Sequence, residues 1–177
     1  AHDLNNKSIL LIDADMRKGS VSKYLGINSH PGLSDILTNG AEADSAFLNC
    51  GVENLTILLA GKIAKNPSEL LASKKMHNLI ASFKDKFDYI FIDSPPVVPL
   101  TDACILGPMV DGVILIVQAG RTQQATVKHA ENRLHQAGVK TVGIVMTNIE
   151  YHLPQYLYRY VQDYGSYAYS KDNKGTN

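Results

Sequence analysis

Two carboxylates and a guanidinium follow a short apolar run near the start of the chain. The run covers residues 9–12 (Ile-Leu-Leu-Ile), and directly after it come Asp13, Asp15 and Arg17. Four consecutive apolar residues are too few for a helix and predict a strand buried on both faces. Ligands of open parallel α/β sheets bind just beyond the carboxyl ends of the strands. Oxygen ligands and an arginine there favour a phosphate and Mg²⁺ site over an ordinary polar turn.

A second acid-tipped apolar run covers residues 88–93 and continues into Ser94-Pro95-Pro96. It has the form of a Walker B strand, whose terminal Asp holds Mg²⁺ through water in P-loop NTPases. The two prolines end the strand and predict a loop over the site. Asp13, Asp15 and Asp93 therefore lie where neighbouring strand ends could share one metal ion. Together the two stretches predict a nucleotide site.

Composition narrows the class of protein. At 177 residues the chain can form one domain with a sizeable core. Lys+Arg and Asp+Glu both number 17, so the overall charge does not predict nucleic-acid binding. Two cysteines, Cys50 and Cys104, are too few for a disulfide framework or a metal site. No apolar run approaches the ~18 residues of a membrane span, so the sequence as given predicts a soluble domain.

Apolar runs alternate with helical patterns along the chain. Strands are expected at residues 9–12, 55–59, 88–93, 112–117 and 141–147, and helices at 32–37, 41–48, 68–83, 101–106 and 122–136. Ser68 is expected to cap the long helix, and Gly138 to end the last one. This alternation predicts an α/β fold with a doubly wound, mostly parallel sheet over residues 1–150.

A phosphate-binding loop is missing from this pattern. Such a loop requires Gly-x-x-x-x-Gly-Lys-Ser/Thr between a strand and a helix, so that backbone N–H groups and a lysine surround the phosphates. Gly61-Lys62 is followed by Ile63 and has no glycine five positions earlier. Residues 1–7 have the character of the end of a helix. We therefore expect a strand, the phosphate loop and most of a helix to be encoded upstream of Ala1.

The C-terminal residues 151–177 differ in composition and are expected to form a helix and a tail. Seven tyrosines fall within 19 residues: Tyr151, Tyr156, Tyr158, Tyr160, Tyr164, Tyr167 and Tyr169. Packing of a helix explains Tyr156 and Tyr160, which are one turn apart. It does not explain residues 164–169, where the residues between the rings are small and polar. Residues 170–177 are polar and predict disorder.

With these motifs in place, the sequence resembles the bacterial tyrosine kinase (BY-kinase) family over about residues 7–169. Residues 11–17 (Leu-Ile-Asp-Ala-Asp-Met-Arg) resemble its Walker A′ motif, and residues 92–96 (Ile-Asp-Ser-Pro-Pro) resemble its Walker B motif. Residues 66–71 (Asn-Pro-Ser-Glu-Leu-Leu) resemble its segment between them, and residues 110–121 and the tail tyrosines also agree. The resemblance implies a P-loop NTPase fold of the MinD/ParA type, here without its N-terminal strand and P-loop.

The resemblance also implies an activity: an ATP-dependent protein-tyrosine autokinase that regulates capsule or exopolysaccharide polymerisation and export. Asp13, Asp15, Arg17 and Asp93 would be catalytic, with Asp15 and Asp93 on Mg²⁺ and Asp13 as base or metal-side acid. Asn148 would meet the adenine. The tyrosines expected to accept phosphate from this kinase lie in the tail, namely Tyr156, Tyr158, Tyr160, Tyr164, Tyr167 and Tyr169.

The partners implied are ATP, further copies of the chain in a ring, a membrane-anchored co-polymerase or activator domain that is fused or separate, and a cognate tyrosine phosphatase. The implied location is the cytoplasmic face of the bacterial plasma membrane. Two departures from the family pattern stand out. Without a phosphate loop, this fragment alone should bind ATP poorly and be nearly inactive. Lys18-Gly19-Ser20 also stands where the family usually has a proline.

Two other functions fit parts of the sequence. A ParA/MinD-like ATPase switch shares the Walker motifs but phosphorylates no protein. Such an ATPase has no need of clustered tyrosines, and a membrane-binding one would end in a basic amphipathic helix, which this chain lacks. A catalytically inactive adaptor that kept only the fold is the third reading. The tyrosine cluster favours the kinase.

Overall fold

The computed structural model describes residues 7–27 and 30–149. The predicted helix end at residues 1–6 and the C-terminal unit at 151–177 lie outside the described residues. Within the part described, no helix is long and apolar enough to cross a membrane.

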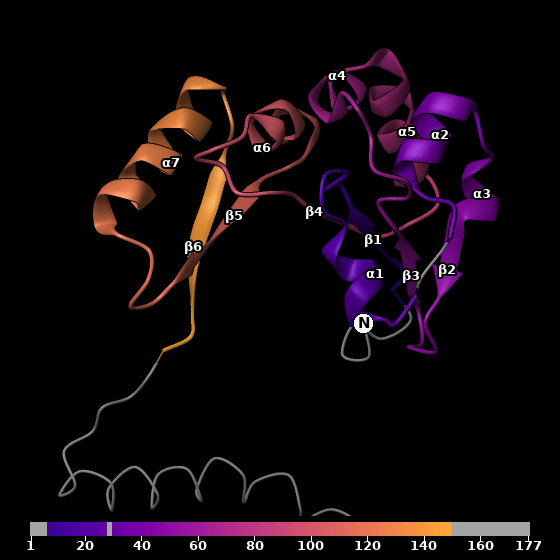
Figure 1. Ribbon diagram of the computed structural model, residues 1–177, viewed down its shortest axis with the longest axis horizontal. Coiled ribbons are helices and arrows are strands. Elements are labelled where there is room, and N and C mark those ends of the chain that lie inside the picture. The colour runs from indigo at the N-terminus through magenta and orange to yellow at the C-terminus, as the bar shows by residue number, and fades with distance from the viewer. Residues whose placement is uncertain (1–6, 28–29, 150–177) are drawn as a thin grey trace, which may run out of the picture.

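Four strands form the larger sheet in the order β2-β3-β1-β4 (Figure 1). Their bounds are β1 Ile9–Asp13, β2 Phe47–Asn49, β3 Leu55–Leu58 and β4 Tyr89–Asp93. β1 runs parallel to both β3 and β4, whereas β2 pairs antiparallel with β3. The apolar run at the start of the chain is therefore an inner strand, and Leu10 and Ile12 are fully buried, as predicted.

The helices cover this sheet and supply most of its core. The helices of the described chain are α1 Ser20–Tyr24, α2 Leu33–Asn39, α3 Ala43–Ala46, α4 Pro67–Leu71, α5 Lys74–Lys84, α6 Asp102–Leu106 with the 3-10 turn Gly107–Met109, and α7 Gln124–Gln136, of which α7 packs on the other two strands instead. Met76, Ile80 and Phe83 recur at helical spacing on α5 and are buried against the sheet. Each such side chain contributes about 1.5–3 kcal/mol to folding.

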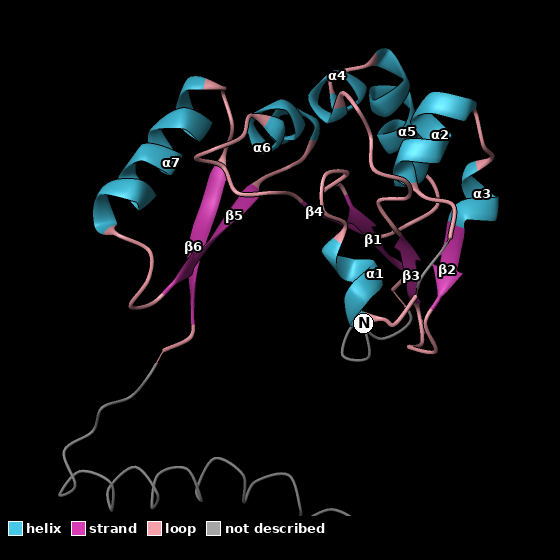
Figure 2. Ribbon diagram, viewed as in Figure 1, coloured by secondary structure: helices cyan, strands magenta, loops and turns pink. Residues whose placement is uncertain are grey.

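The remaining strands, β5 Val113–Gln118 and β6 Thr141–Thr147, form a separate parallel pair. Figures 1 and 2 show them beside α7, apart from the other four strands. Both were predicted as strands, at residues 112–117 and 141–147. Leu115 and Val117 of β5 are buried against α7, whereas Ile114 and Ile116 alternate with them, face the other side and are more than half exposed, as is Val142 of β6.

Two predicted helices are corrected by the structure. The helix expected at 41–48 ends at Ala46, and residues 47–49 form β2, because they pair antiparallel with β3, the next strand in the chain. The helix expected at 68–83 is divided into α4 and α5. Ser73 starts the second helix, where its hydroxyl accepts a hydrogen bond from the Met76 N–H at 3.2 Å. The predicted cap is also wrong, since Ser68 lies inside α4 and Asn66 precedes it.

Candidate functional site

The acids at the ends of β1 and β4 lie side by side. Asp13 and Asp93 are register partners in the parallel pairing of these strands, and the Ala14 N–H donates to the Asp93 carbonyl at 2.8 Å. Register partners on neighbouring strands point to the same face of a sheet. The folding of two apolar runs into adjacent strands therefore brings together carboxylates that are 80 positions apart in the sequence.

Asp13 is fully buried and held by the loop that follows it. Its Oδ1 accepts from the Asp15 N–H at 3.0 Å, and its Oδ2 accepts from the Val21 N–H at 3.1 Å. Burial raises the pKa of Asp13 above its ordinary value, and the charges of Asp93 and Asp15 raise it further; the two N–H donors offset part of that rise. Both oxygens face inward, so this carboxylate acts on the geometry of the loop.

Asp15 is partly exposed and lies in a tight turn. Its Oδ1 accepts from the N–H groups of Arg17 and Lys18, both at 3.1 Å, and its carbonyl accepts from the Gly19 N–H at 2.8 Å. Among the described residues Oδ2 has no hydrogen-bond donor. Asp15 therefore presents one carboxylate oxygen from a turn whose backbone fixes the other.

Asp93 ends β4 and is exposed. Partial desolvation raises its pKa, and the negative charge of Asp15 raises it further. An excess of negative charge without a neighbouring cation is a suitable environment for a bound metal ion. In residues 7–27 and 30–149, however, no three Asp, Glu, His or Cys side chains group closely enough to hold a metal by themselves. The acids fit a Mg²⁺ that takes its remaining ligands from phosphate and water, which is the usual arrangement for this ion.

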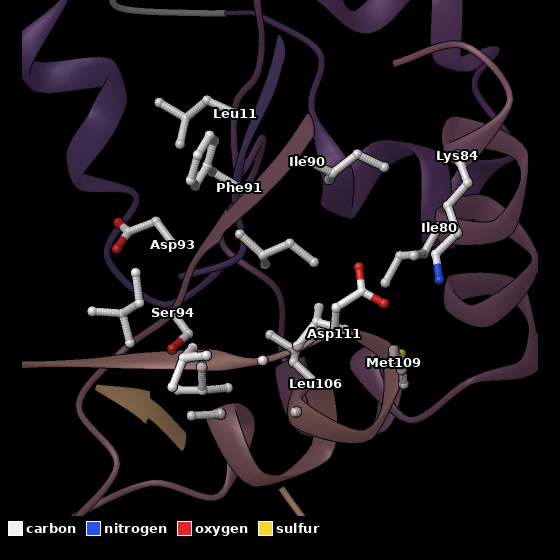
Figure 3. A pocket seen from close by; sticks show the side chains of 18 of the residues that line it. Leu11, Ile80, Lys84, Ile90, Phe91, Asp93, Ser94, Leu106, Met109 and Asp111 are labelled. Atoms are coloured by element: carbon white, nitrogen blue, oxygen red, sulfur yellow. The ribbon is translucent and has the colours of Figure 1, made fainter. Parts of the chain in front are cut away.

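A cavity of about 800 Å³ opens beside β4 (Figure 3). Ile90, Phe91, Ile92 and Asp93, four consecutive residues of β4, all line it, and so do Val113 and Ile114 of β5. Consecutive side chains of a strand point to opposite faces, so a cavity that touches all of them lies along the strand edge. We call this cavity between the edges of β4 and β5 the interstrand slot. In Figure 3, Asp93 and Ser94 lie on one side of it and Lys84 lies on the other.

Asp15 does not line the interstrand slot but lines a second hollow, of about 630 Å³. Its lining is rich in polar and basic side chains, with Lys18, Lys23 and Lys62 among them. Each of the two acids with access to solvent thus borders a different cavity.

Arg17, the third group predicted at the site, forms an ion pair with Asp102, a residue that the sequence did not indicate as part of the site. Its guanidinium pairs with the buried carboxylate of Asp102 and with the hydroxyl of Ser68. Arg133 of α7 is a second such residue, since its Nη1 donates to the carbonyls of Val97 and Val98 in the loop after β4. Neither arginine has a local sequence signal for its contacts, because its partners are 35 or more positions away.

Asn148 follows the end of β6 with φ +55° and is exposed. It is separated in the fold from the sheet that carries the acids, and its predicted contact with adenine stays a prediction. The tyrosines expected to accept phosphate lie outside the described residues.

The chain is similar to several known proteins. An AAA domain family profile matches residues 3–138. The chain is 35% identical over 146 residues to the tyrosine-protein kinase ptk of Acinetobacter johnsonii, covering 82% of this chain and 20% of that protein. It is 32% identical over 166 residues to the tyrosine-protein kinase CpsD of Streptococcus agalactiae, covering 93% of this chain and 70% of that protein.

Among solved structures, the VpsO kinase domain superposes with a TM-score of 0.78 at 32% identity, covering 82% of this chain and 72% of that one. MinD structures match at 23% identity or less, which shows a shared fold. The mostly parallel α/β fold expected from the sequence is confirmed. The chain spans about a fifth of the length of several of the curated kinases that it matches.

Proposed function

The chain belongs to the bacterial tyrosine kinase family, and from this we propose that the full-length protein transfers the γ-phosphoryl group of ATP to tyrosines of its own C-terminal segment. We further propose that this activity regulates capsule or exopolysaccharide assembly. One observation carries the proposal: the register of β1 and β4 places Asp13 beside Asp93 at the carboxyl ends of adjacent parallel strands.

In the transfer, a tyrosine phenol oxygen bonds to the γ-phosphorus, the bond to the ADP oxygen breaks, and the phenolic proton leaves to a base. We propose Asp15 as that base in place of Asp13, which the sequence suggested, because both oxygens of Asp13 already accept N–H bonds. Asp15 Oδ2 has no donor among the described residues, and Asp15 borders the second hollow. An unperturbed phenol has a pKa near 10, so a nearby carboxylate assists its deprotonation.

Asp93 is the residue suited to a metal ligand or to a water held by the metal, because it is exposed at a strand end that already carries excess negative charge. When bound, Mg²⁺ would neutralise part of the negative charge on the ATP phosphates. Asp13, with both oxygens engaged in N–H bonds, orients the loop that carries Asp15. Most of the rate is then supplied by positioning and by electrostatics.

The phosphate loop belongs at the interstrand slot. Both bordering strands have one edge without a strand partner in the described chain, and the slot is lined along β4 by apolar side chains that end at Asp93. We propose that a strand from a preceding segment of the full-length protein occupies the slot. Its carboxyl end would then deliver a Gly-rich loop beside Asp93, as phosphate loops follow strands in this fold.

The proposed partners follow from the same chemistry. A neighbouring copy of the chain would present its tail tyrosines at Asp15, so that copies form a ring at the cytoplasmic face of the membrane. A membrane-anchored activator domain, fused or separate, would hold the ring there, and a tyrosine phosphatase would reverse the reaction. Each phosphate adds about −1.5 to −2 charges to the tail. Several of them would repel it from the carboxylate site and loosen the ring.

Mass spectrometry of the full-length protein after incubation with ATP and Mg²⁺ tests the proposal. We expect phosphotyrosine in residues 151–177, with occupancy highest at Tyr164, Tyr167 and Tyr169. Asp15→Asn and Asp93→Asn should each lower the rate of tyrosine phosphorylation by about 100-fold or more, which is the usual effect of losing one catalytic group. Asp44→Asn, which changes an exposed acid that lines neither of the two hollows, is the control and should leave the phosphotyrosine occupancy unchanged. ATP hydrolysis without phosphotyrosine would instead indicate a partitioning-type ATPase.

A further inference from the structure

A partly buried ion pair connects the loop after β1 to the segment after β4. The Arg17 guanidinium donates from Nε to Asp102 Oδ2 and from Nη2 to Asp102 Oδ1, both at 3.2 Å. Ser68 adds a hydroxyl that donates to Asp102 Oδ1 at 2.7 Å and accepts from Arg17 Nη2 at 2.8 Å. The side chain of Asp102 is 1% exposed and that of Arg17 36% exposed. We call this three-residue arrangement the Arg17 clamp.

The clamp joins three segments that are distant in the sequence. Arg17 lies in the loop after β1, Ser68 in the first turn of α4, and Asp102 at the start of α6. The loop after β1 carries Asp15, and α6 follows the loop that leaves Asp93. A two-pronged guanidinium–carboxylate pair fixes orientation as well as distance, which a lysine in the same place would not do.

Hydrogen bonds connect the clamp to the acids one step at a time. The backbone N–H of Arg17 donates to Asp15 Oδ1 at 3.1 Å, and the N–H of Asp15 donates to Asp13 Oδ1 at 3.0 Å. Holding the Arg17 side chain therefore fixes the peptide groups that orient both carboxylates. A loop released from Asp102 would keep its acids but lose the geometry between them.

We infer that Asp102 is a positioning residue for the kinase site, acting through Arg17 to set the loop that presents Asp13 and Asp15 opposite Asp93. This inference rests on the proposed function only for its catalytic consequence. Its structural part concerns the described residues alone. Asp102 touches no reacting atom in this assignment. Its role is to restrain a loop at the place where the ends of β1 and β4 meet.

The test uses the full-length protein and the variant Asp102→Asn, which keeps the side-chain shape and removes the charge. The matched control is Asp88→Asn. Asp88 joins the same two strands at their opposite ends, where it pairs with Lys7 at 2.8 Å and accepts the Ser8 N–H at 2.8 Å. Amide hydrogen exchange, read residue by residue by NMR, is the first measurement, because it does not require kinase activity.

In Asp102→Asn we expect the amides of Asp15, Arg17, Lys18 and Val21 to exchange at least ~10-fold faster, while the amides within β1 and β3 keep their rates. In Asp88→Asn the same loop amides should be unchanged. Equal acceleration over the whole sheet would mean that Asp102 only stabilises the fold, and unchanged loop amides would mean that the clamp does not restrain the loop. Either result overturns the inference.

The second measurement is autophosphorylation at varied Mg²⁺ concentration. Asp102→Asn should lower kcat by about 10-fold and raise the Mg²⁺ concentration for half-maximal rate, with the KM for ATP within about 3-fold. Arg17→Lys should behave alike, and the double variant should be no worse than either single one. Arg17→Lys also allows the test to be made if Asp102→Asn does not fold.

Additive losses, or a wild-type Mg²⁺ response in both variants, would overturn the positioning role. A wild-type protein without phosphotyrosine would refute the proposed function. The hydrogen-exchange measurement would then still test whether the Arg17 clamp restrains the loop.

Discussion

Asp93 is partly desolvated and carries its negative charge close to Asp15, and this arrangement lowers the stability of the fold. Its raised pKa means that the folded protein holds the Asp93 proton more tightly than the unfolded chain does. The ionised carboxylate therefore lowers the free energy of unfolding at pH 7. This loss disappears as the pH falls through the raised pKa and below the ordinary value of about 3.9.

We accordingly expect Asp93→Asn to melt about 1–2 °C higher than wild type at pH 7, roughly 0.5 kcal/mol for a partly exposed charge. The difference should close below about pH 4, where the wild-type side chain is neutral. Thermal denaturation followed by circular dichroism at several pH values measures it, with no nucleotide or Mg²⁺ present. Asp111→Asn, at another acid of the interstrand slot, is the control and should show no such gain. A variant that melts at or below the wild-type temperature at pH 7 would contradict this account.

Some of these residues could be chosen from the sequence and others could not. Asp13, Asp15 and Asp93 each stand at the end of an apolar run, and that local pattern predicts a strand end near a ligand site. Asp102 follows no such run. Its importance comes from contact with Arg17, 85 positions away, and a single sequence contains no signal for that pairing.

At the scale of elements, the start of α2 is pressed against the loop after β3. The N–H groups of Leu33 and Ser34 donate to the carbonyls of Leu59 and Ala60 at 2.8 and 3.0 Å. Gly32 permits this approach. A methyl group there would lie 2.6 Å from Gly61 Cα and closer still to Gly61 N and Leu59 O. All of these neighbours are backbone atoms, which cannot move aside as a side chain can.

Gly32→Ala should therefore lower the free energy of unfolding by about 3 kcal/mol, at the upper end for overpacking. Urea denaturation of the variant and the wild type measures the change. Gly143→Ala is the matched control, because Gly143 is an exposed strand glycine with open space where its methyl group would go. It should be neutral or slightly stabilising. If the free energy of unfolding of Gly32→Ala lies within about 0.5 kcal/mol of the wild-type value, as for most surface substitutions, the contact is looser than described.

The elements themselves were predictable where the pattern was local. The run at 9–12, the acid-tipped strand ending at Asp93 and the helix up to Gln136 all follow from apolar periodicity. The strand at 47–49 was missed because it exists only through antiparallel pairing with β3. The break at Ser73 had a local signal, a serine before a helical run, but the continuous apolar spacing on both sides of it indicated one helix.

At the scale of the whole molecule, the described strands form two sheets, and the interstrand slot lies between their facing edges. In a parallel strand, alternate N–H groups point to the two neighbours. β4 has β1 on one side, and β5 has β6 on one side, so every second amide of each strand faces the slot. A strand seated there would protect these amides.

Hydrogen exchange of the full-length protein should thus show similar protection for all amides of β4 and β5, because the proposed strand pairs with both. In the isolated 177-residue chain, the slot-facing half should exchange faster, on the order of 100-fold. The amides of β1, an inner strand in both cases, serve as the internal control. Rapid exchange of every second amide in the full-length protein would show that no strand occupies the slot.

The inner position of β1 also bears on how the polypeptide is made. Its partner on one side, β4, comes much later in the chain: Ser8 and Asp88 at their starts are 80 residues apart. A ribosome adding about 5–20 residues per second needs roughly 4–16 s to synthesise that interval. During this time the apolar run at 9–12 has emerged without the strand that will cover its edge. The newly made chain therefore passes through a period of seconds in which a chaperone has access to its central strand, and slowing translation between β1 and β4 should lengthen that period in proportion.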